Sequence, residues 1–392
     1  RDDVKRLLAT FLLSAALASL LLGCQEAAVA PPATPGQVAP PAGPPAPGRQ
    51  PRVEVVAGGL EVPWAIAFAD EVPGLGRGSY LLFSERPGRL RLIVNGELQA
   101  EPLATLPVTA VGESGLMGLA LDPAFATNGH LYVMYTYRVG VGLQNRISRL
   151  TVSGREARDE KVLLDGIPGG FIHDGGRLAF GPDGKLYATT GDAGRGELAQ
   201  DRQSLAGKIL RLDANGSVPV DNPFAGSPIF SYGHRNPEGL AWHPQTGRLY
   251  STEHGPSGHD EVNRIRAGGN YGWPSVAGAG GRPPFVDPVH ESGSDTWAPA
   301  GAAFYAGDLF PRWQNNLFFG ALRGRHLHRL ALGGQEGEQV VAAERLFVGE
   351  YGRIRAVAAG PDGALYFSTS NRDGRGQPTA DDDRILRLVA GD

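Results

Sequence analysis

Apolar and polar positions alternate along most of the chain in short runs, which are separated by turns rich in glycine, proline and aspartate. One four-residue pattern, a small or polar residue followed by apolar ones, recurs six times at intervals of 53 to 62 residues. The copies are residues 65–68, 118–121, 177–180, 239–242, 301–304 and 356–359. Alternation with a period of two predicts β-strands, and no segment shows the long 3.6-residue period of a helix.

Most copies are followed by a turn and a second apolar run, and each unit closes with a third. The second runs are residues 131–133, 186–188, 249–251 and 365–367. The third runs are residues 89–92, 146–150, 208–212, 261–265, 327–330 and 384–388. Six repeats of an antiparallel sheet predict an all-β fold, a six-bladed β-propeller of four-stranded antiparallel blades. A β-helix would need shorter repeats, and a β-sandwich gives no reason for a sixfold recurrence.

The N-terminal segment has a different pattern. Lys5 and Arg6 precede an apolar run over residues 7–22, which is short for a membrane-spanning helix and is typical of a secretion signal. The run ends in Leu21-Leu22-Gly23-Cys24, which resembles a bacterial lipobox. We therefore expect a signal peptide with a lipobox over residues 1–24, export to the periplasmic or cell-surface side, and a membrane contact only through a lipid on Cys24. A signal peptide that is cleaved without lipidation of Cys24 is the alternative.

Residues 25–51 are mostly alanine, proline and glycine, a composition that predicts a disordered linker. The propeller is therefore expected over residues 52–392. With 57 glycines, 31 prolines and 41% hydrophobic residues, the chain has many turns and still enough apolar side chains for a large core. The net charge of -4 argues against a nucleic-acid partner. A single cysteine excludes an internal disulfide and a cysteine-based zinc site.

Departures from the repeat are the candidates for function. In the third copy, His173 stands just before the inner strand, which places it at the mouth of the central channel. The neighbouring strand of that copy ends at Asp192, whose carboxylate is placed to orient the imidazole as a base. A histidine with a purely structural role is the alternative at this position.

The fourth copy begins with Arg235 and Asn236 at the equivalent place. A guanidinium beside an amide suits a ligand with carboxylate or carbonyl oxygens. The second strand of this copy ends in Glu253-His254-Gly255-Pro256, and Asp260-Glu261 follows. Backbone carbonyls from a Gly-Pro turn with carboxylates nearby fit calcium, although a solvated acidic loop explains the same pattern.

The sixth copy begins with Arg353 and Arg355, which share one face of a strand because they are two residues apart. Such a pair often forms salt bridges on a solvated surface. Together with Arg235 and Arg323, it predicts instead a cationic lining of the channel that attracts a ligand with several carboxylates.

A longer set of motifs carries a family resemblance. The motifs are His173, Gly181-Pro182-Asp183-Gly184, Gly191-Asp192, residues 207–212, residues 233–239, Glu253-His254-Gly255-Pro256, Asp260-Glu261 and residues 269–274. Together they resemble the soluble dehydrogenases of aldoses and glucose that depend on pyrroloquinoline quinone (PQQ), over about Val53 to Leu388. The resemblance implies a six-bladed propeller that binds PQQ and calcium and oxidises the C1 hydroxyl of an aldose to a lactone.

The resemblance also implies roles for the catalytic residues. His173 is expected to take the proton of the C1 hydroxyl while hydride passes to the quinone, and Asp192 is expected to hold the imidazole. Arg235 is expected to polarise the quinone carbonyl. Asn236, Arg353 and Arg355 are expected to bind oxygens and carboxylates of PQQ.

For the metal, the resemblance implies that the carbonyls of Gly255 and Pro256 ligate the calcium that contacts PQQ. A second calcium, present in some members, is expected to involve Glu261 and the carbonyl of Tyr271.

Three positions depart from the glucose-specific members. Arg323 replaces a lysine, and Glu113 and Glu197 replace glutamines that contact cofactor or substrate. We keep all three as cofactor-binding candidates, and the departures favour the broader aldose branch over strict glucose specificity.

The expected partners are an aldose substrate and an external electron acceptor, a quinone or a cytochrome. Two other classes of function remain open at this level: a calcium-dependent propeller that hydrolyses lactones or esters, and a binding propeller without turnover. The arginines expected in the channel argue against the first, and the set His173, Asp192 and Arg235 argues against the second.

Overall fold

The computed structural model describes residues 50–335 and 337–391. These residues belong to one compact unit, residues 48–392. The predicted signal peptide, Cys24 and residues 25–49 of the predicted linker lie outside the described residues. No helix in the described part of the chain is long and apolar enough to cross a membrane.

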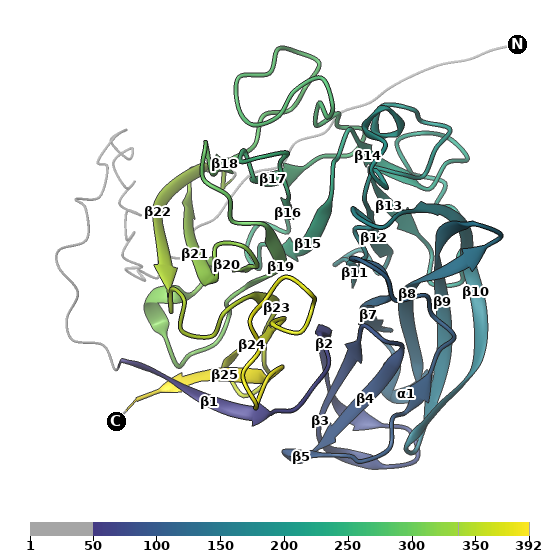
Figure 1. Ribbon diagram of the computed structural model, residues 1–392, viewed down its shortest axis with the longest axis vertical. Helices are drawn as coiled ribbons and strands as arrows, with labels where there is room; N and C mark the ends of the chain where they lie inside the picture. The colour runs from purple at the N-terminus through teal and green to yellow at the C-terminus, as the bar shows by residue number, and fades with distance from the viewer. Residues whose placement is uncertain (1–49, 336, 392) are drawn as a thin grey trace, which may run out of the picture. The chain divides into compact units, whose positions relative to one another are not determined.

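Six antiparallel sheets follow one another around a central axis (Figure 1), which confirms the predicted six-bladed β-propeller. Blade one contains β2 (Pro63–Val72), β3 (Gly76–Glu85), β4 (Arg89–Val94), β5 (Glu97–Leu98) and β6 (Ala104–Thr105). Blade two contains β7 (Leu116–Leu121), β8 (His130–Val139), β9 (Gly142–Ser153) and β10 (Glu156–Gly169). Blade three contains β11 (Leu178–Phe180), β12 (Leu186–Thr190), β13 (Lys208–Leu212) and β14 (Ile229–Tyr232).

The other three blades repeat this order from the axis outward. Blade four contains β15 (Pro237–Trp242), β16 (Leu249–Glu253), β17 (Glu261–Ile265) and β18 (His290–Glu291). Blade five contains β19 (Pro299–Phe304), β20 (Leu317–Ala321), β21 (His326–Gly333) and β22 (Gln339–Leu346). Blade six contains β23 (Ile354–Ala359), β24 (Leu365–Thr369), β25 (Ile385–Ala390) and β1 (Pro51–Ala57).

Five blades have the predicted four strands, and blade one has a fifth, because the two short strands β5 and β6 both pair with β4. Helical structure among the described residues is limited to short pieces. These are α1 (Phe125–Asn128), η1 (Gly196–Ala199) and η2 (Pro311–Trp313).

All six copies of the predicted pattern fall in or next to innermost strands, which are β2, β7, β11, β15, β19 and β23. Neighbouring inner strands contact one another, and β23 contacts β2, so the ring closes. The alternating apolar residues of each blade pack against the next blade, as Trp64, Leu131 and Leu186 do in one cluster that spans the first three blades. Both faces of the middle strands are covered in this way, so every residue of β12 and of β20 is buried.

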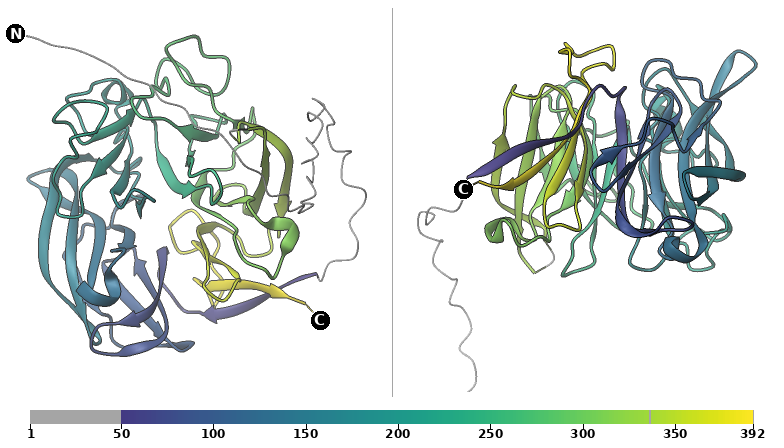
Figure 2. Two further views of the ribbon diagram at one scale, coloured as in Figure 1. Left: turned by 180° about the vertical axis from the view of Figure 1, so that it is seen from behind. Right: turned by 90° about the horizontal axis from the view of Figure 1, so that it is seen from below.

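The ring is closed by a strand from the start of the described chain. β1 pairs in antiparallel fashion with β25, with Pro51 opposite Ala390, and forms the outer strand of blade six (Figure 2). The sequence analysis placed Pro51 in the linker, whereas the residue begins this strand. The closing strand was missed because it lies far in sequence from the repeat that it completes.

One end of the propeller carries the site. Each inner strand begins at this end, where the second strand ends and the third begins, as the pairs Pro237–Glu253 and Glu253–Glu261 show in blade four. We call this end the mouth. The loops at the mouth therefore come from every blade and converge on the axis, the arrangement by which propellers usually build sites.

Candidate active site

The predicted base lies at the mouth of blade three. His173 precedes β11 and is 9% exposed. Its Nδ1 lies 2.7 Å from the Oδ1 of Asp192, which follows β12. Because the carboxylate accepts, Nδ1 carries the proton of the neutral ring, and Nε2 is left as the basic nitrogen. The structure therefore brings the predicted base and its predicted partner together.

Asp192 is held by two more donors. The backbone N–H of Gly194 donates to Oδ1 at 2.7 Å, and the indole Nε1–H of Trp273 donates to Oδ2 at 2.8 Å. The carboxylate is 1% exposed, so its orientation is set by these contacts and not by water. Trp273 lies in the aromatic turn after β17, a motif that the sequence analysis noted without assigning this side chain a role.

Arg235 lies beside this group. Its guanidinium carbon is 5.3 Å from the centre of the Trp273 ring, and its Nε has no hydrogen-bond partner in the described part of the chain. Burial lowers the pKa of Arg235 from its ordinary value, although the side chain remains a cation at neutral pH. Arg235 therefore has a donor left for a ligand.

Asn236 is fully buried beneath the site. Its Oδ1 accepts the backbone N–H of Gly175 at 2.9 Å, and its amide nitrogen lies 3.4 Å from Nδ1 of His254. The Nε2 of His254 has no hydrogen-bond partner among the described residues and lies 3.7 Å from Glu238, beyond hydrogen-bond length. After Arg235, His254 is therefore a second side chain with a buried nitrogen that lacks a hydrogen-bond partner. It was not among the predicted site residues.

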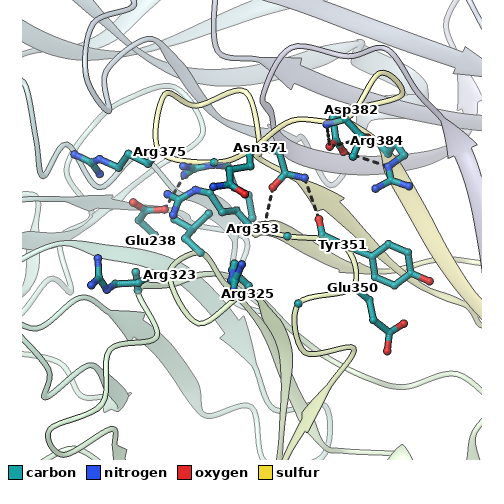
Figure 3. A pocket seen from close by; sticks show the side chains of 18 of the residues that line it. Glu238, Arg323, Arg325, Glu350, Tyr351, Arg353, Asn371, Arg375, Asp382 and Arg384 are labelled. Atoms are coloured by element: carbon teal, nitrogen blue, oxygen red, sulfur yellow. Dashed lines mark hydrogen bonds and ion pairs between the residues drawn. The ribbon is translucent and has the colours of Figure 1, made fainter.

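A cavity of about 590 Å³ opens between blades four, five and six at the mouth (Figure 3). Six arginines line it: Arg323, Arg325, Arg353, Arg355, Arg375 and Arg384. Glu113, Glu238 and His254 are also part of its wall. We call it the mouth cavity. Arg323, Arg353 and Arg355 of the predicted cationic lining lie here, whereas Arg235 lines a smaller cavity. Arg325, Arg375 and Arg384 were not predicted.

The two predicted cofactor arginines of blade six are paired with acids. The Nε of Arg353 donates to Asp373 at 2.8 Å, and Nη1 of Arg355 donates to Glu238 at 3.0 Å. Arg323, in contrast, has no ion pair with any described residue. The alternative of salt bridges on a solvated surface does not hold, because both arginines are buried with their acid partners. They also line the mouth cavity, as a cationic lining requires.

The four predicted metal ligands, which the resemblance divides between two calcium ions, lie around one small cavity of about 10 Å³, roughly the room for one ion or water molecule. Its lining includes Gly255, Pro256, Glu261 and Tyr271, together with Glu253. We call it the ion pocket. Burial and then the charge of Glu253 raise the pKa of Glu261 to about 8. Two buried carboxylates side by side favour a proton or a cation between them.

The described residues contain no cluster of three or more histidine, cysteine, aspartate and glutamate side chains that suits a metal ion. A cation in the ion pocket would therefore take backbone carbonyls as well as carboxylates, which is the ligand set that calcium accepts.

The two predicted glutamates differ in position. Glu113 lies in the wall of the mouth cavity, and its Oε2 accepts the backbone N–H of His173 at 2.7 Å. Glu197 lies in η1, is exposed and lines neither the mouth cavity nor the ion pocket. A cofactor contact of Glu197 stays a prediction without a structural argument.

The chain is similar to known dehydrogenases in sequence and in structure. The Glucose / Sorbosone dehydrogenase family matches residues 60–387. The chain is 35% identical to aldose sugar dehydrogenase YliI of Escherichia coli (strain K12) over 350 residues, 82% of this chain and 91% of that protein. It is 39% identical to quinoprotein glucose dehydrogenase B of Acinetobacter calcoaceticus over 199 residues, 43% of this chain and 41% of that protein.

Among solved structures, the PQQ-bound form of aldose sugar dehydrogenase from Streptomyces coelicolor is similar with a TM-score of 0.76 and 39% identity. The similarity covers 88% of this chain and 99% of that chain.

Proposed function

The chain belongs to the glucose/sorbosone dehydrogenase family, and from this premise we propose that it oxidises the C1 hydroxyl of aldose sugars to lactones with PQQ and calcium as cofactors. One observation carries the proposal. The basic Nε2 of His173, fixed through Nδ1 by the buried carboxylate of Asp192, lies at the mouth of a propeller beside a cavity lined by arginines.

The residues present fit PQQ, which carries several carboxylates and carbonyl oxygens. Arg323 has no ion pair with any described residue, and Arg235 and His254 keep buried nitrogens without partners. The nitrogens of Arg235 and His254 are unmet donors, because buried polar atoms are normally hydrogen bonded. Arg323 is exposed and lines the mouth cavity. Arg323, Arg353 and Arg355 would hold the carboxylates, and Arg235 would face a carbonyl oxygen.

The chemistry at the sugar follows from the positions of three side chains. Nε2 of His173 takes the proton of the C1 hydroxyl, and Asp192 stabilises the imidazolium that forms. Arg235 provides positive charge where negative charge develops on the acceptor side. Bound PQQ supplies the acceptor for the hydride from C1, so that the sugar loses two electrons and one proton goes to His173. The electrons leave to an external acceptor, a quinone or a cytochrome.

Calcium fits the ion pocket for an electrostatic reason. The carboxylates of Glu253 and Glu261 are both nearly buried, and their mutual repulsion is relieved by a divalent cation. The carbonyls of Gly255, Pro256 and Tyr271 would complete the oxygen ligands. Gly255 cannot carry a side chain, because a Cβ there would lie 2.0 Å from the carbonyl oxygen of Gly258.

The proposal is tested by adding PQQ and calcium to the purified apoprotein and following an artificial electron acceptor dye with a panel of aldoses. We expect dye reduction with several aldoses, and none when PQQ is left out. If no aldose reduces the dye in the loaded protein, the proposal fails. Hydrolysis of a lactone by the metal-loaded protein without PQQ would favour the alternative hydrolase.

The cellular location is part of the same proposal. The apolar run before Cys24 supports export and a lipid anchor at that residue. Radiolabelled fatty acid should enter the full-length chain expressed in bacteria and should not enter a Cys24→Ala variant. Equal labelling of the two proteins would contradict lipid attachment at Cys24.

A further inference from the structure

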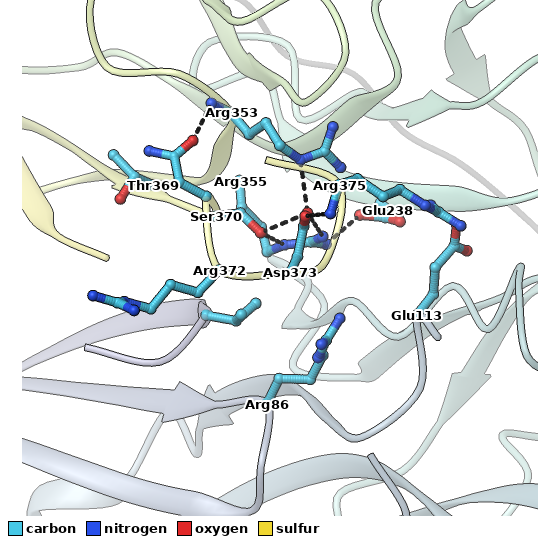
Figure 4. A network of polar contacts seen from close by, with 12 residues as sticks. Arg86, Glu113, Glu238, Arg353, Arg355, Thr369, Ser370, Arg372, Asp373 and Arg375 are labelled. Atoms are coloured by element: carbon cyan, nitrogen blue, oxygen red, sulfur yellow. Dashed lines mark hydrogen bonds and ion pairs between the residues drawn. The ribbon is translucent and has the colours of Figure 1, made fainter. Parts of the chain in front are cut away.

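Arg375, which lies on the loop between β24 and β25, reaches from the last blade to the catalytic base. Its Nη1 lies 2.5 Å from Oε1 of Glu113 at the mouth of blade two. The other oxygen of Glu113 accepts the backbone N–H of His173 at 2.7 Å. Figure 4 shows Arg375 and Glu113 facing each other across the mouth. One carboxylate thus joins an arginine of blade six to the base of blade three.

The backbone of His173 needs such a support. Its φ is 62°, in the left-handed region that a residue with a Cβ rarely adopts. Residues held in that region persist where their surroundings fix them, and they are common at functional sites. The ring of His173 is fixed at Nδ1 by Asp192, so the contact from Glu113 to the backbone N–H fixes the other end of the same residue.

The contacts continue from Arg375 to the arginines of the mouth cavity. Oδ1 of Asp373 accepts the backbone N–H of Arg375 at 2.9 Å. Oδ2 of Asp373 accepts Nε of Arg353 at 2.8 Å and lies 3.6 Å from Nη2 of Arg355. A continuous chain of polar contacts therefore runs from Arg353 to His173, and Figure 4 shows its residues from Arg353 to Glu113.

Both acids in this chain are ionised at neutral pH. Burial alone would raise the pKa of Glu113, but His254, the amide of His173 and Arg375 outweigh it and lower the pKa to about 2. Burial likewise opposes the charge of Asp373, and Arg355 and Arg353 leave its pKa below the ordinary value. The ion pair between Glu113 and Arg375 is therefore present over the pH range in which a histidine base works.

We propose that Arg375 and Glu113 are positioning residues for the base: Arg375 orients Glu113, and Glu113 holds the backbone of His173 in the conformation that places its ring at the sugar. Because Asp373 holds both Arg353 and the backbone of Arg375, one loop aligns the cofactor arginines and the base together. This inference rests on the proposed function for its catalytic meaning. The proposal assigns Glu113 this role in place of the cofactor contact predicted from the sequence.

A measurement on the apoprotein tests the link without any turnover. In protein labelled with ¹⁵N-histidine, the amide proton of His173 should resonate downfield because it is bonded to a carboxylate. The signal should move upfield in Glu113→Gln and in Arg375→Gln, and should return most of the way in Arg375→Lys. An unchanged His173 amide in Arg375→Gln overturns the proposal even if the protein proves to have no dehydrogenase activity.

Kinetics of the loaded enzyme give the second test. In Arg375→Gln and Glu113→Gln we expect kcat for an aldose to fall by about 10- to 100-fold, because a small misplacement of a catalytic group has an effect of this size. The dissociation constant of PQQ should change by less than about threefold. The double variant should be no slower than the slower single variant, because both changes break one link.

Arg266→Gln is the matched control, since Arg266 is an exposed arginine at the opposite end of blade four. The Arg266→Gln variant should have the same kcat and Tm as the unmodified chain. If the losses of kcat in the two single variants multiply in the double variant, the positioning role is overturned. It is also overturned if Arg375→Gln loses PQQ binding and Tm to a degree that accounts for its loss of kcat.

Discussion

At the scale of single residues, the geometry of the site depends on Asp192, because three donors converge on its carboxylate. His173 and the amide of Gly194 bind Oδ1, and Trp273 binds Oδ2. Donors on both oxygens leave this carboxylate little freedom to rotate. Trp273 therefore fixes the plane of the carboxylate that orients the ring of His173.

Replacing Trp273 by phenylalanine removes the N–H and keeps most of the ring. We expect kcat/KM of the PQQ-loaded protein for an aldose to fall by about 10-fold, because Asp192 loses the donor that fixes the plane of its carboxylate and then orients the ring of His173 less well. Steady-state kinetics with an artificial electron acceptor measure this change. Trp313→Phe, which changes a tryptophan in η2, should leave kcat/KM unchanged. An unchanged kcat/KM in Trp273→Phe would contradict the role of the indole N–H.

The ion pocket predicts a pH dependence with a definite sign. The pKa of Glu261 is raised to about 8 in the metal-free fold, against an ordinary value of 4.5. Between these two pH values the folded state binds a proton that the unfolded state has lost. The contribution of this proton to stability is full below pH 4.5, falls as the pH rises, and is gone above about pH 8. Calcium replaces that proton, and its stabilising effect should therefore be larger at pH 8.5 than at pH 5.5.

Thermal unfolding of the apoprotein with calcium and with a chelator measures this difference in Tm. Glu261→Gln should abolish most of the calcium effect at both pH values. Glu344→Gln, a change in an exposed ion pair with Arg329, should leave the effect intact. A calcium effect of the same size at both pH values in the unmodified chain would contradict the exchange of a proton on Glu261 for calcium.

At the scale of the elements, the mouth loops are fixed by buried polar side chains from the strands beneath them. Lys208, the first residue of β13, is fully buried, and its Nζ donates to the carbonyls of Leu198, Ala199 and Ala206. The loop that joins Asp192 to β13 has little regular structure apart from η1, so these bonds set its path. This loop in turn carries Gln200, which donates to the carbonyl of Trp273 at 2.7 Å.

Lys208→Met keeps the apolar stem and leaves three buried carbonyls without their donor. We expect the free energy of unfolding to fall by about 3 kcal/mol, measured by urea denaturation, because each unpaired buried acceptor is costly. The comparison is Lys185→Met, which breaks a half-exposed pair with Asp213 and should cost less than about 1 kcal/mol. Equal losses in the two variants would show that the buried bonds of Lys208 do not hold the loop.

The elements were largely predictable, because the apolar period of two marked the inner strands and the third strands of all six blades. The residue pair His173 and Asp192 was predictable for the same reason, because His173 precedes the inner strand of blade three and Asp192 follows its second strand at the same end. The roles of Trp273, His254 and Arg375 were not predictable, because their contacts come from loops whose path no periodic pattern sets. Asp373 was not predictable either, because it is one acid in a loop rich in polar residues.

At the scale of the whole molecule, the ring depends on a contact between its two ends. β1 provides the outer strand of blade six, and Val53 packs in the same apolar cluster as Leu388. Arg387 also pairs with Glu54 across this seam at 2.8 Å. Without β1, the edge of β25 would be exposed, and blade six, which carries Arg353 and Arg355, would lose its outer support.

A chain that starts at Gly58 lacks this strand. We expect a lower Tm than for a chain that starts at Gly48, together with weaker PQQ binding, because blade six carries the cofactor arginines. Thermal unfolding and PQQ titration of the two chains measure both effects. A truncated chain with unchanged Tm and PQQ affinity would show that the seam does not stabilise the site.

The central claim is that His173 is the base for oxidation of an aldose by bound PQQ. It is tested most directly by stopped-flow absorbance of the PQQ- and calcium-loaded protein mixed with an aldose in the absence of any acceptor. We predict that the cofactor spectrum changes to its reduced form within the turnover time in the unmodified chain. In His173→Gln the same change should be slower by about 10³-fold at an unchanged PQQ affinity. Equal rates in the two proteins would contradict the account.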